Sequence, residues 1–489
     1  MIAALLWGVA LAPLAAAAEP LALAYDDALQ RALDGNPAAL GASADLRRAD
    51  GALLAARAVF DPQLVANADR AVETRENLAV GGAVAETDSL RTNGGATLSS
   101  FLPTGTTAAL SFLSSQNRTL YAFADAEEEA LFRQLGLVNE NPFFFTNLSA
   151  TLSQSLLQGH RMAWNLRGVR QATRGRDAAA LVARQQQQAA LADAARAYWA
   201  LWTQLRLVDI ARQSLTVALE EQKITTVRVE QGVLAPVERS RVDAAVVQAR
   251  SALLDAENAA RGAADALLIA IGEAPGREVQ LLTPPAELAP VTLDAEALVA
   301  VAIQGNPQAE ALRLALDHAN RDLADARHAL LPELSGRVSY GINGFEQGDR
   351  SAAIAEMFEG QLNSWSVGAD LSVPLFNRAD RGSLDSARAS AQRAEIDLRA
   401  FERSLGQQVL AQVRTLESAR LRVDLAAANL RLAEDTLAAE RALAEAGRSL
   451  PRDVLAAMRG LDDAKVALER ARADWQAAIV ALEQLKGTL

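Results

Sequence analysis

Alternating apolar and polar residues mark several segments of the chain as β-strands. Every second residue is apolar in Leu334–Asn343 and in Trp365–Val373, and Phe144–Ser153 follows the same two-residue period. Segments of about ten residues with one apolar and one polar face are typical of membrane barrel strands. Half-buried strands of a soluble sandwich produce the same alternation, so the strands alone leave both interpretations open.

Two long stretches without proline, residues 161–231 and 382–446, predict long helices. At a rise of 1.5 Å per residue, each spans on the order of 100 Å. A short turn follows each, and a return helix is expected over residues 237–271 and 452–486. Large apolar residues alternate with alanine at heptad spacing, which predicts antiparallel coiled-coil hairpins; in the second hairpin these are Val409, Leu416, Ala419, Val423, Ala426, Leu430, Ala433 and Leu437.

The chain contains two copies of one unit. Gly35-Asn36-Pro37 recurs 270 residues later as Gly305-Asn306-Pro307, whereas the turns after the long helices recur at an offset of 215. Leu152–Leu156 recurs as Leu371–Leu375 at an offset of 219, so the offset falls by 51 (from 270 to 219) between residues 64 and 152, and the first copy carries an insertion of about that size. We expect a first repeat over 19–280 (helix 25–60, strands and insertion 63–157, hairpin 161–271) and a second over 281–489 (helix 294–330, strands 334–376, hairpin 382–486).

Each Gly-Asn-Pro predicts a break in a helix. Glycine suits the left-handed end of one helix, asparagine caps the next, and proline fits a first turn that needs no N–H donor.

The insertion predicts one additional β-hairpin. Its strands are expected over Ala96–Phe101 and Thr106–Leu113, joined by a turn that contains Pro103 and Gly105. Residues 119–142, which are rich in acidic side chains, are expected to form an exposed loop. The sequence leaves open whether this hairpin joins a barrel wall or folds over its rim.

The first 18 residues are typical of a secretory signal peptide. Ile2–Leu14 is apolar, and Ala16-Ala17-Ala18 offers a small-residue cleavage site before Glu19. The alternative is a buried N-terminal helix. Export would expose the mature chain to the periplasm.

Composition and charge argue against several classes of protein. Hydrophobic residues make up 50% of the chain but aromatic residues only 4%, as in long Ala/Leu helices with wet faces. The net charge of −12 disfavours nucleic acid as a partner. The absence of cysteine excludes disulfides and thiolate sites.

Five arginines gather where the first long helix begins: Arg161, Arg167, Arg170, Arg174 and Arg176. Because the net charge disfavours nucleic acid as their partner, we expect them to form a basic collar just below a membrane.

No constellation for catalysis or metal binding stands out. The three histidines, His160, His318 and His328, lie outside any recognisable helical zinc motif, although His318 precedes Asp322 by four residues. Nucleophile-elbow, phosphate-loop and dinucleotide motifs are missing from the sequence. We therefore predict no enzyme activity, no cofactor and no metal site.

The two hairpin tips carry the most informative loops. In each, glycine ends the incoming helix, proline starts the outgoing one, and an acid, Glu238 or Asp453, suits the helix dipole. Turn chemistry does not explain apolar residues at an exposed tip, which suggest a docking surface. The candidate docking residues are Gly232, Val233, Leu234, Gly447, Arg448, Ser449 and Leu450.

In the order and spacing of its elements, the chain resembles the TolC-type outer-membrane efflux and secretion channel family. The likeness covers the whole mature chain and rests on the duplicated unit, the Asn-Pro helices, Leu152–Gly159 before a long helix, Ala446–Leu455 and the ending Leu485–Leu489. The resemblance implies an α+β membrane protein in the outer membrane, a homotrimer whose subunits each give four strands to one shared 12-stranded β-barrel. Its helices would form a periplasmic tunnel.

The resemblance also implies the partners and a gate. Periplasmic adaptor (membrane fusion) proteins would dock at the tips and connect the channel to an inner-membrane transporter, while outer-membrane lipid would surround the barrel. Acid–arginine contacts often close such tips. Asp453 matches one acid, Ala456 stands where a second often occurs and Ser449 where an arginine often sits, so the candidate gate residues are Glu238, Asp453 and Arg448.

Two other functions fit parts of the sequence: a periplasmic coiled-coil adaptor and a soluble coiled-coil scaffold. An adaptor has one hairpin, whereas this chain predicts two. A scaffold has no need of alternating strands with Phe143, Phe144, Phe145 and Trp365 near their ends, where a membrane aromatic girdle would lie. The cargo is not encoded in any recognisable motif.

Overall fold

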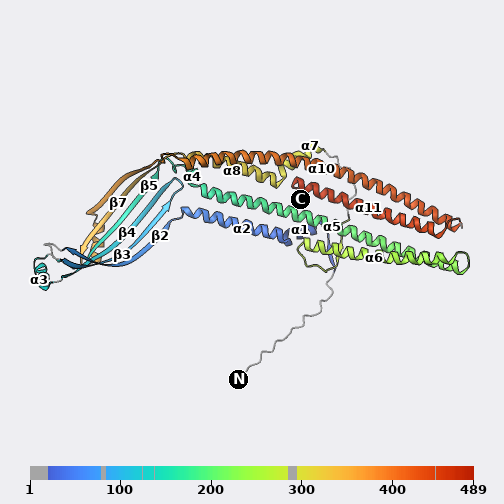
Figure 1. The fold of residues 1–489 in the computed structure, drawn as a ribbon, viewed down its shortest axis with the longest axis horizontal. Helices are drawn as coiled ribbons and strands as arrows, with labels where there is room; N and C mark the ends of the chain where they lie inside the picture. The colour runs from blue at the N-terminus through green and yellow to red at the C-terminus, as the bar shows by residue number, and fades with distance from the viewer. Residues whose placement is uncertain are drawn as a thin grey trace, which may run out of the picture. The chain divides into compact units, whose positions relative to one another are not determined.

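The computed structural model describes residues 20–78, 84–123, 125–136, 138–284, 294–446 and 448–488. The expected signal peptide and Gly447 lie outside these residues. The chain divides into two compact units. The hairpin unit contains residues 1–47, 178–315 and 395–489, and the sheet unit contains residues 48–177 and 316–394. Long helices together with an antiparallel sheet confirm the mixed helix-and-strand fold expected from the sequence (Figure 1).

One antiparallel sheet of six strands, in the order β2-β3-β4-β5-β7-β8, dominates the sheet unit (Figure 1). The strands are β2 (Gln63–Leu78), β3 (Val84–Phe101), β4 (Thr106–Phe123), β5 (Phe143–Ser155), β7 (Glu333–Gln347) and β8 (Leu362–Ser372). The resemblance implies four strands from each chain, whereas the sheet holds six, because the insertion in the first repeat adds a full hairpin to it.

The inserted hairpin is longer than predicted. The expected strands 96–101 and 106–113 extend to Val84–Phe101 and Thr106–Phe123, because ladder pairing continues through their polar outer halves. The expected acidic loop 119–142 instead contains the end of β4 and the helix α3 (Ala126–Gln134). Asp125 caps that helix by accepting a hydrogen bond from the Glu127 N–H at 2.9 Å.

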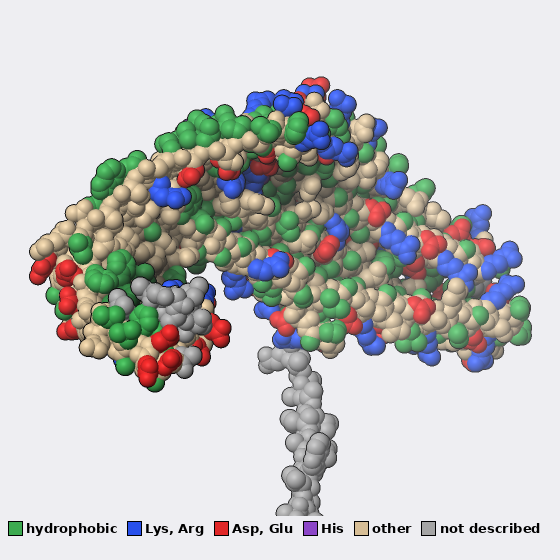
Figure 2. Space-filling model, turned by 60° about the vertical axis from the view of Figure 1, so that its left-hand side comes forward, with side chains coloured by type: hydrophobic (Ala, Val, Ile, Leu, Met, Phe, Trp, Pro, Cys, Tyr) green, Lys and Arg blue, Asp and Glu red, His purple; other side chains and the backbone are tan. Residues whose placement is uncertain are grey.

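The sheet has one apolar and one polar face. The ladder aligns one apolar row across all six strands: Leu64, Leu98, Leu110, Ala150, Tyr340 and Trp365. On the opposite face, cross-strand hydrogen bonds join Thr97 to Ser111 at 3.1 Å, Asn147 to Asn343 at 2.7 Å and Ser339 to Ser366 at 2.7 Å. Figure 2 shows hydrophobic side chains along the outer side of the curved sheet.

A short helix, α9 (Arg350–Glu359), lies within the segment predicted as strands 334–376. It packs on β5 and β7, where the Thr146 hydroxyl donates to the Ala353 carbonyl oxygen at 2.9 Å. Gly344 permits this approach, since a Cβ atom there would lie 1.9 Å from the Ala353 oxygen.

Two helical hairpins extend through the hairpin unit. The first joins α5 (Arg167–Glu230) to α6 (Pro236–Ala270), and the second joins α10 (Arg378–Glu445) to α11 (Pro451–Lys486) (Figure 1). Gln222 on α5 donates to Asp243 on α6 at 2.6 Å, and Gln412 on α10 donates to the Ala478 carbonyl on α11 at 2.9 Å. None of the described helices combines the length and apolar character needed to cross a bilayer.

Each hairpin has its own hydrophobic core. The first core packs Leu23, Tyr198 and Leu267 beside the two-stranded sheet of β1 (Leu21–Leu23) and β6 (Val279–Leu281). The second core packs Leu405, Val409 and Trp475 against α7. The shorter helices are α1 (Tyr25–Gly35), α2 (Pro37–Arg57), the 3-10 turn η1 (Ala58–Phe60), α4 (Met162–Asn165), α7 (Ala295–Gly305) and α8 (Pro307–Ala329).

The two Gly-Asn-Pro segments break their helices in the same way. Asn36 separates α1 from α2 and accepts a hydrogen bond from the Ala38 N–H at 2.9 Å, and Asn306 accepts from the Gln308 N–H at 2.9 Å. Gly272, with φ of +79°, lies against the Gly35 backbone, and Gly487, with φ of +73°, lies against Gly305. The close backbone approach leaves no room for a side chain at these glycines.

Candidate functional site

The first hairpin tip is a tight turn that exposes valine. Gly232 adopts φ of +74°. The Val233 N–H donates to the Arg228 carbonyl at 2.9 Å, which ends α5. Ala235 is extended, so Pro236 occupies the first position of α6, where no donor is missed. The side chain of Val233 is 68% exposed, while Leu234 is half-buried.

The second tip has a different internal brace. The Arg448 N–H donates to the Leu443 carbonyl at 2.8 Å, and the Ser449 hydroxyl donates to the Glu440 carboxylate at 2.7 Å. Leu450 is extended and 44% exposed, directly before Pro451. Val233 and Leu450 therefore each expose an apolar side chain at the end of a hairpin. Packing within the chain does not explain why these two residues are apolar.

The structure does not bring the three candidate gate residues together. Glu238 pairs with Arg241 of its own helix at 2.7 Å, and Asp453 lies 3.4 Å from the neighbouring Arg452. Within the described residues, the Arg448 guanidinium has no ion-pair partner. The Asp453–Arg452 pair is exposed, and such pairs contribute little to stability, about 0–1 kcal/mol, whereas the Glu238 side chain is only 13% exposed. Any closing contact of Arg448 would have to come from outside a single chain.

Behind the tips, an apolar cluster joins the two hairpins. Val242 of α6 is fully buried against Leu437 of α10 and against Val454, Leu455 and Met458 of α11. The pattern of apolar residues that continues past both tips carries a signal for this cluster, which was not among the predictions from the sequence. The cluster fixes the two tips relative to one another.

A half-buried carboxyl group lies further along the same hairpins. Asp462 on α11 lines an open cavity of about 650 Å³ between residues of α5, α6 and α11, seven of which are alanines. Burial raises the pKa of the Asp462 carboxyl, and a hydrogen bond with Ser214 offsets part of this effect.

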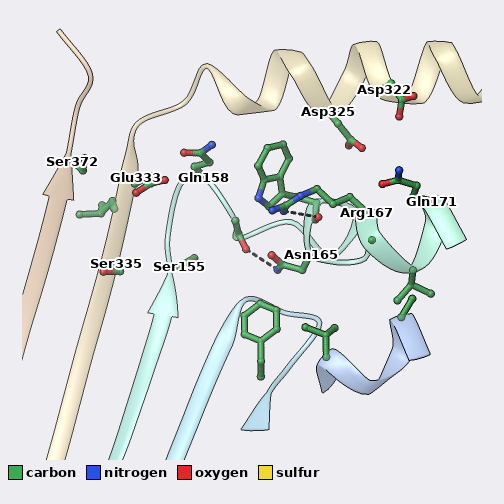
Figure 3. Close-up of a pocket in the computed structure, with 18 of the residues that line it drawn as sticks. Ser155, Gln158, Asn165, Arg167, Gln171, Asp322, Asp325, Glu333, Ser335 and Ser372 are labelled. Atoms are coloured by element: carbon green, nitrogen blue, oxygen red, sulfur yellow. Dashed lines mark hydrogen bonds between the residues drawn. The ribbon is translucent and has the colours of Figure 1, made fainter. Parts of the chain in front are cut away.

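An open hollow of about 1060 Å³ lies in the sheet unit where strands end and helices begin (Figure 3). The Arg167 guanidinium lies 4.4 Å from the centre of the Trp164 ring, a cation–π distance. Asn165 fastens the turn by donating to the carbonyl oxygens of Gly159 at 2.8 Å and Pro103 at 3.0 Å. Figure 3 shows Asp322 and Asp325 on α8 directed toward the start of α5.

The predicted basic collar is largely paired with carboxylates. Arg170 binds Asp325 at 2.5 Å, Arg174 binds Asp322 at 2.6 Å, and Arg176 binds Asp50 at 3.2 Å. The acids come from α8 and α2, more than a hundred residues away from α5 in the sequence. These ion pairs join the helices to one another and leave little net positive charge for a phosphate ligand.

Two histidines meet beside the hollow. His328 is only 6% exposed, and its ring lies 5.5 Å from that of His160 and 5.3 Å from that of Trp164. Burial lowers the pKa of His328, and the charges of Arg161 and His160 lower it further. Burial and Arg174 likewise lower the pKa of His318. Among the described residues, no three potential ligands are grouped as a metal site.

The comparisons with known proteins agree with one another. The sequence model of a family described as outer membrane efflux protein matches residues 145–273 and 298–488. No curated protein matches the chain.

Several solved structures share the fold. The outer membrane protein VceC from Vibrio cholerae has a TM-score of 0.65 at 16% identity, over 95% of this chain and 96% of that one. The CmeC outer membrane channel of Campylobacter jejuni has a TM-score of 0.64 at 13% identity, over 95% and 85%. A membrane protein from Pseudomonas aeruginosa has a TM-score of 0.62 at 20% identity, over 94% and 90%.

Proposed function

Because the chain belongs to the outer membrane efflux protein family, we propose that it is the exit-duct subunit of a tripartite efflux pump or a type I secretion system. Three copies share one β-barrel in the outer membrane, and their helices form a tunnel in the periplasm through which cargo passes passively. The protein is a member of a channel family and not an enzyme.

The observation that carries this proposal is the two-faced sheet. Its apolar row, from Leu64 to Trp365, suits contact with lipid, and its hydrogen-bonded Ser, Thr and Asn side chains suit a wet interior. Six strands are too few to close around a channel, so the wall requires further copies of the chain. A bilayer cannot satisfy open strand edges, which supports closure between copies.

The hairpin tips are proposed to dock a periplasmic adaptor protein, which connects the duct to an inner-membrane transporter. The docking residues are Gly232, Val233, Leu234, Gly447, Arg448, Ser449 and Leu450. Exposed Val233 and Leu450 support this role, because burial of such side chains against a partner removes apolar surface from water. Buried in full, each contributes about 1.5–3 kcal/mol.

The tips are also the proposed gate. Glu238 and Asp453 are engaged by arginines of their own helices, whereas Arg448 has no ion-pair partner among the described residues. We propose that Arg448 of one copy pairs with an acid at the tip of the next copy and narrows the tunnel there. Because the Arg448 side chain is exposed, its closing contact is individually weak and can yield when an adaptor binds.

A periplasmic adaptor or a coiled-coil scaffold is not favoured for this chain. Neither of these two classes of protein requires two hairpins together with a six-stranded sheet that carries a continuous apolar row.

Site-specific photo-crosslinking at Val233 and Leu450 in intact cells tests the docking role. We expect both positions to capture the same exported adaptor, identified by mass spectrometry. The matched control is Gln231, an exposed polar residue beside the first tip, changed to aspartate so that charge is added and Val233 is kept. Val233→Asp should abolish co-purification of the adaptor and Gln231→Asp should preserve it; equal effects of both would refute docking through Val233.

A further inference from the structure

We propose that all six strands of each chain belong to the shared barrel wall, and that β8 of one copy pairs with β2 of the next. The inference rests on the proposed function, and with three copies it gives a wall of 18 strands. The inserted hairpin is then part of the membrane wall and widens the exit.

Continuous pairing of the inserted strands is the first argument. Every residue of β2, from Gln63 to Leu78, has a partner in β3, and β3 is paired with β4 over almost its whole length. β4 is in turn paired with β5, without a break, over Thr106–Asn117. A β3–β4 hairpin folded over the rim would instead leave β2 to pair with β5, whereas β2 pairs with β3 in this sheet.

The side chains of the inserted hairpin also keep the inside–outside pattern of the other strands. A second row parallel to the Leu64 row holds Ala66, Ala96, Phe112, Leu148, Ile342 and Asn363. Register fixes which face each residue occupies, because a slip by one residue would reverse them all. The inserted strands therefore present apolar side chains to the same side as β5, β7 and β8.

The two edges of the sheet fit each other. Every residue of β8 is exposed, and so are residues 63–76 of β2. Many residues of the four inner strands are instead partly buried. Neither edge strand contains proline, which is one of the devices that block edge pairing. Because the sheet is antiparallel with an even number of strands, β8 and β2 run in opposite directions. Joining them between copies continues the antiparallel ladder without a mismatch.

The number of strands sets the width of the wall. With strands 4.8 Å apart and tilted by about 40°, 18 strands give a backbone diameter of about 36 Å, against about 24 Å for 12. Barrels of 16–18 strands leave an aqueous channel. The backbone diameter of the exit would be about one and a half times that of a wall with four strands per chain.

Cysteine cross-linking in the full-length protein tests the pairing, on a chain that contains no cysteine of its own. Ser366→Cys in β8 is combined with one cysteine in β2, scanned over Gln63, Val65, Asn67 and Asp69, which share the polar face. Because β2 would also meet β8 if the inserted hairpin were folded away, a second pair of variants tests whether β4 lies beside β5: Ser111→Cys with Ser149→Cys, which are partners in the ladder. A third pair, Asn67→Cys with Ser149→Cys, forms a disulfide only if β2 lies beside β5. Ser339→Cys with Ser366→Cys is the control, because their hydroxyls lie 2.7 Å apart within one chain.

We expect at least one β2 position to give disulfide-linked dimers and trimers with Ser366→Cys in outer-membrane extracts. We also expect Ser111→Cys to link to Ser149→Cys, with no disulfide between β2 and β5. A disulfide between β2 and β5 would overturn the six-strand wall while leaving the exit duct in place. A particle of three-copy mass with no β2 linkage would also overturn it. A single-chain particle with only the control disulfide would instead refute the proposed function.

Discussion

The side-chain amide of Asn36 donates a hydrogen bond to the carbonyl oxygen of Ala270 at 3.2 Å. The second repeat makes the same contact, since Asn306 donates to the Leu485 carbonyl at 3.2 Å. Each asparagine thus caps one helix through its oxygen and holds the end of a return helix through its nitrogen. One residue type at one position builds the same junction twice.

Replacing this asparagine should weaken the hairpin unit. Asn36→Ala loses both the cap and the bond to Ala270, and we expect it to lower the free energy of unfolding by about 1–2 kcal/mol. Asn36→Asp keeps the capping oxygen and loses only the donor, so its effect should be smaller. Denaturant unfolding monitored by circular dichroism measures both, and Asn306→Ala should match Asn36→Ala. An unchanged midpoint for both alanine variants would contradict the junction's role.

The glycine at the end of α6 should not tolerate a side chain. A Cβ atom on Gly272 would lie 2.1 Å from the Gly35 oxygen, and φ of +79° is strained for alanine. We expect Gly272→Ala to destabilise the protein by about 1–3 kcal/mol. The control is Gly262→Ala in the exposed interior of α6, where nothing lies within 4 Å; it should stabilise the helix by up to about 1 kcal/mol. Thermal melts of the two variants should therefore shift in opposite directions, and a common shift would count against the contact.

Stability should fall in mild acid because of His328. Burial lowers its pKa, so the folded state favours the neutral ring and the unfolded state takes up the proton first as pH falls. The stability from this site is full above about pH 6.5 and is lost as pH falls through the lowered folded-state pKa. His328→Gln, which keeps an acceptor for the Gly159 N–H, should flatten the decline in melting temperature between about pH 7 and pH 5. The same slope in the variant and the parent would exclude His328 as its source.

Arg448 should hold the tunnel closed. Arg448→Ala removes the proposed contact between copies, and we expect the mean single-channel conductance in planar bilayers to rise several-fold. Arg459→Ala is the matched control, because Arg459 is exposed on α11 and its guanidinium contacts Gln248 at 3.4 Å, away from the tip. Equal conductance of the two variants would show that Arg448 is not part of the gate.

Local chemistry made much of this fold predictable. The Asn-Pro helix breaks and the Gly–Pro turns follow from backbone preferences of single residues, so the sequence locates them closely. The left-handed conformation predicted for the glycine of Gly-Asn-Pro is wrong, because Gly35 and Gly305 remain helical and instead permit a close backbone approach. The alternation of apolar and polar residues in Leu334–Asn343 predicts a strand clearly. In β2, by contrast, the small alanines Ala66 and Ala68 alternate with Asn67 and Asp69, so the difference in hydrophobicity between its two faces is small. The hydrogen bonds to β3, rather than the sequence pattern, make this segment a strand.

Features that depend on distant partners could not be predicted. The arginines at the start of α5 resemble a free basic collar until Asp322 and Asp325 of α8 lie beside them. The burial of His328 likewise depends on Trp164 and His160, which are more than 160 residues away in the sequence. The tip residues are predicted as docking residues from the sequence alone, because turn chemistry leaves Val233 unexplained. Their proposed partners lie outside the chain.

The mass of the particle extracted from the outer membrane tests the central claim most directly. The full-length protein would be expressed in a Gram-negative host, extracted from the separated outer membrane with a mild detergent, and measured by mass photometry with the detergent contribution subtracted. The shared-barrel duct predicts a particle of about three times the chain's mass of 51.8 kDa, less the cleaved segment. A soluble periplasmic monomer would contradict it, and the two-faced sheet would then belong to a different kind of protein.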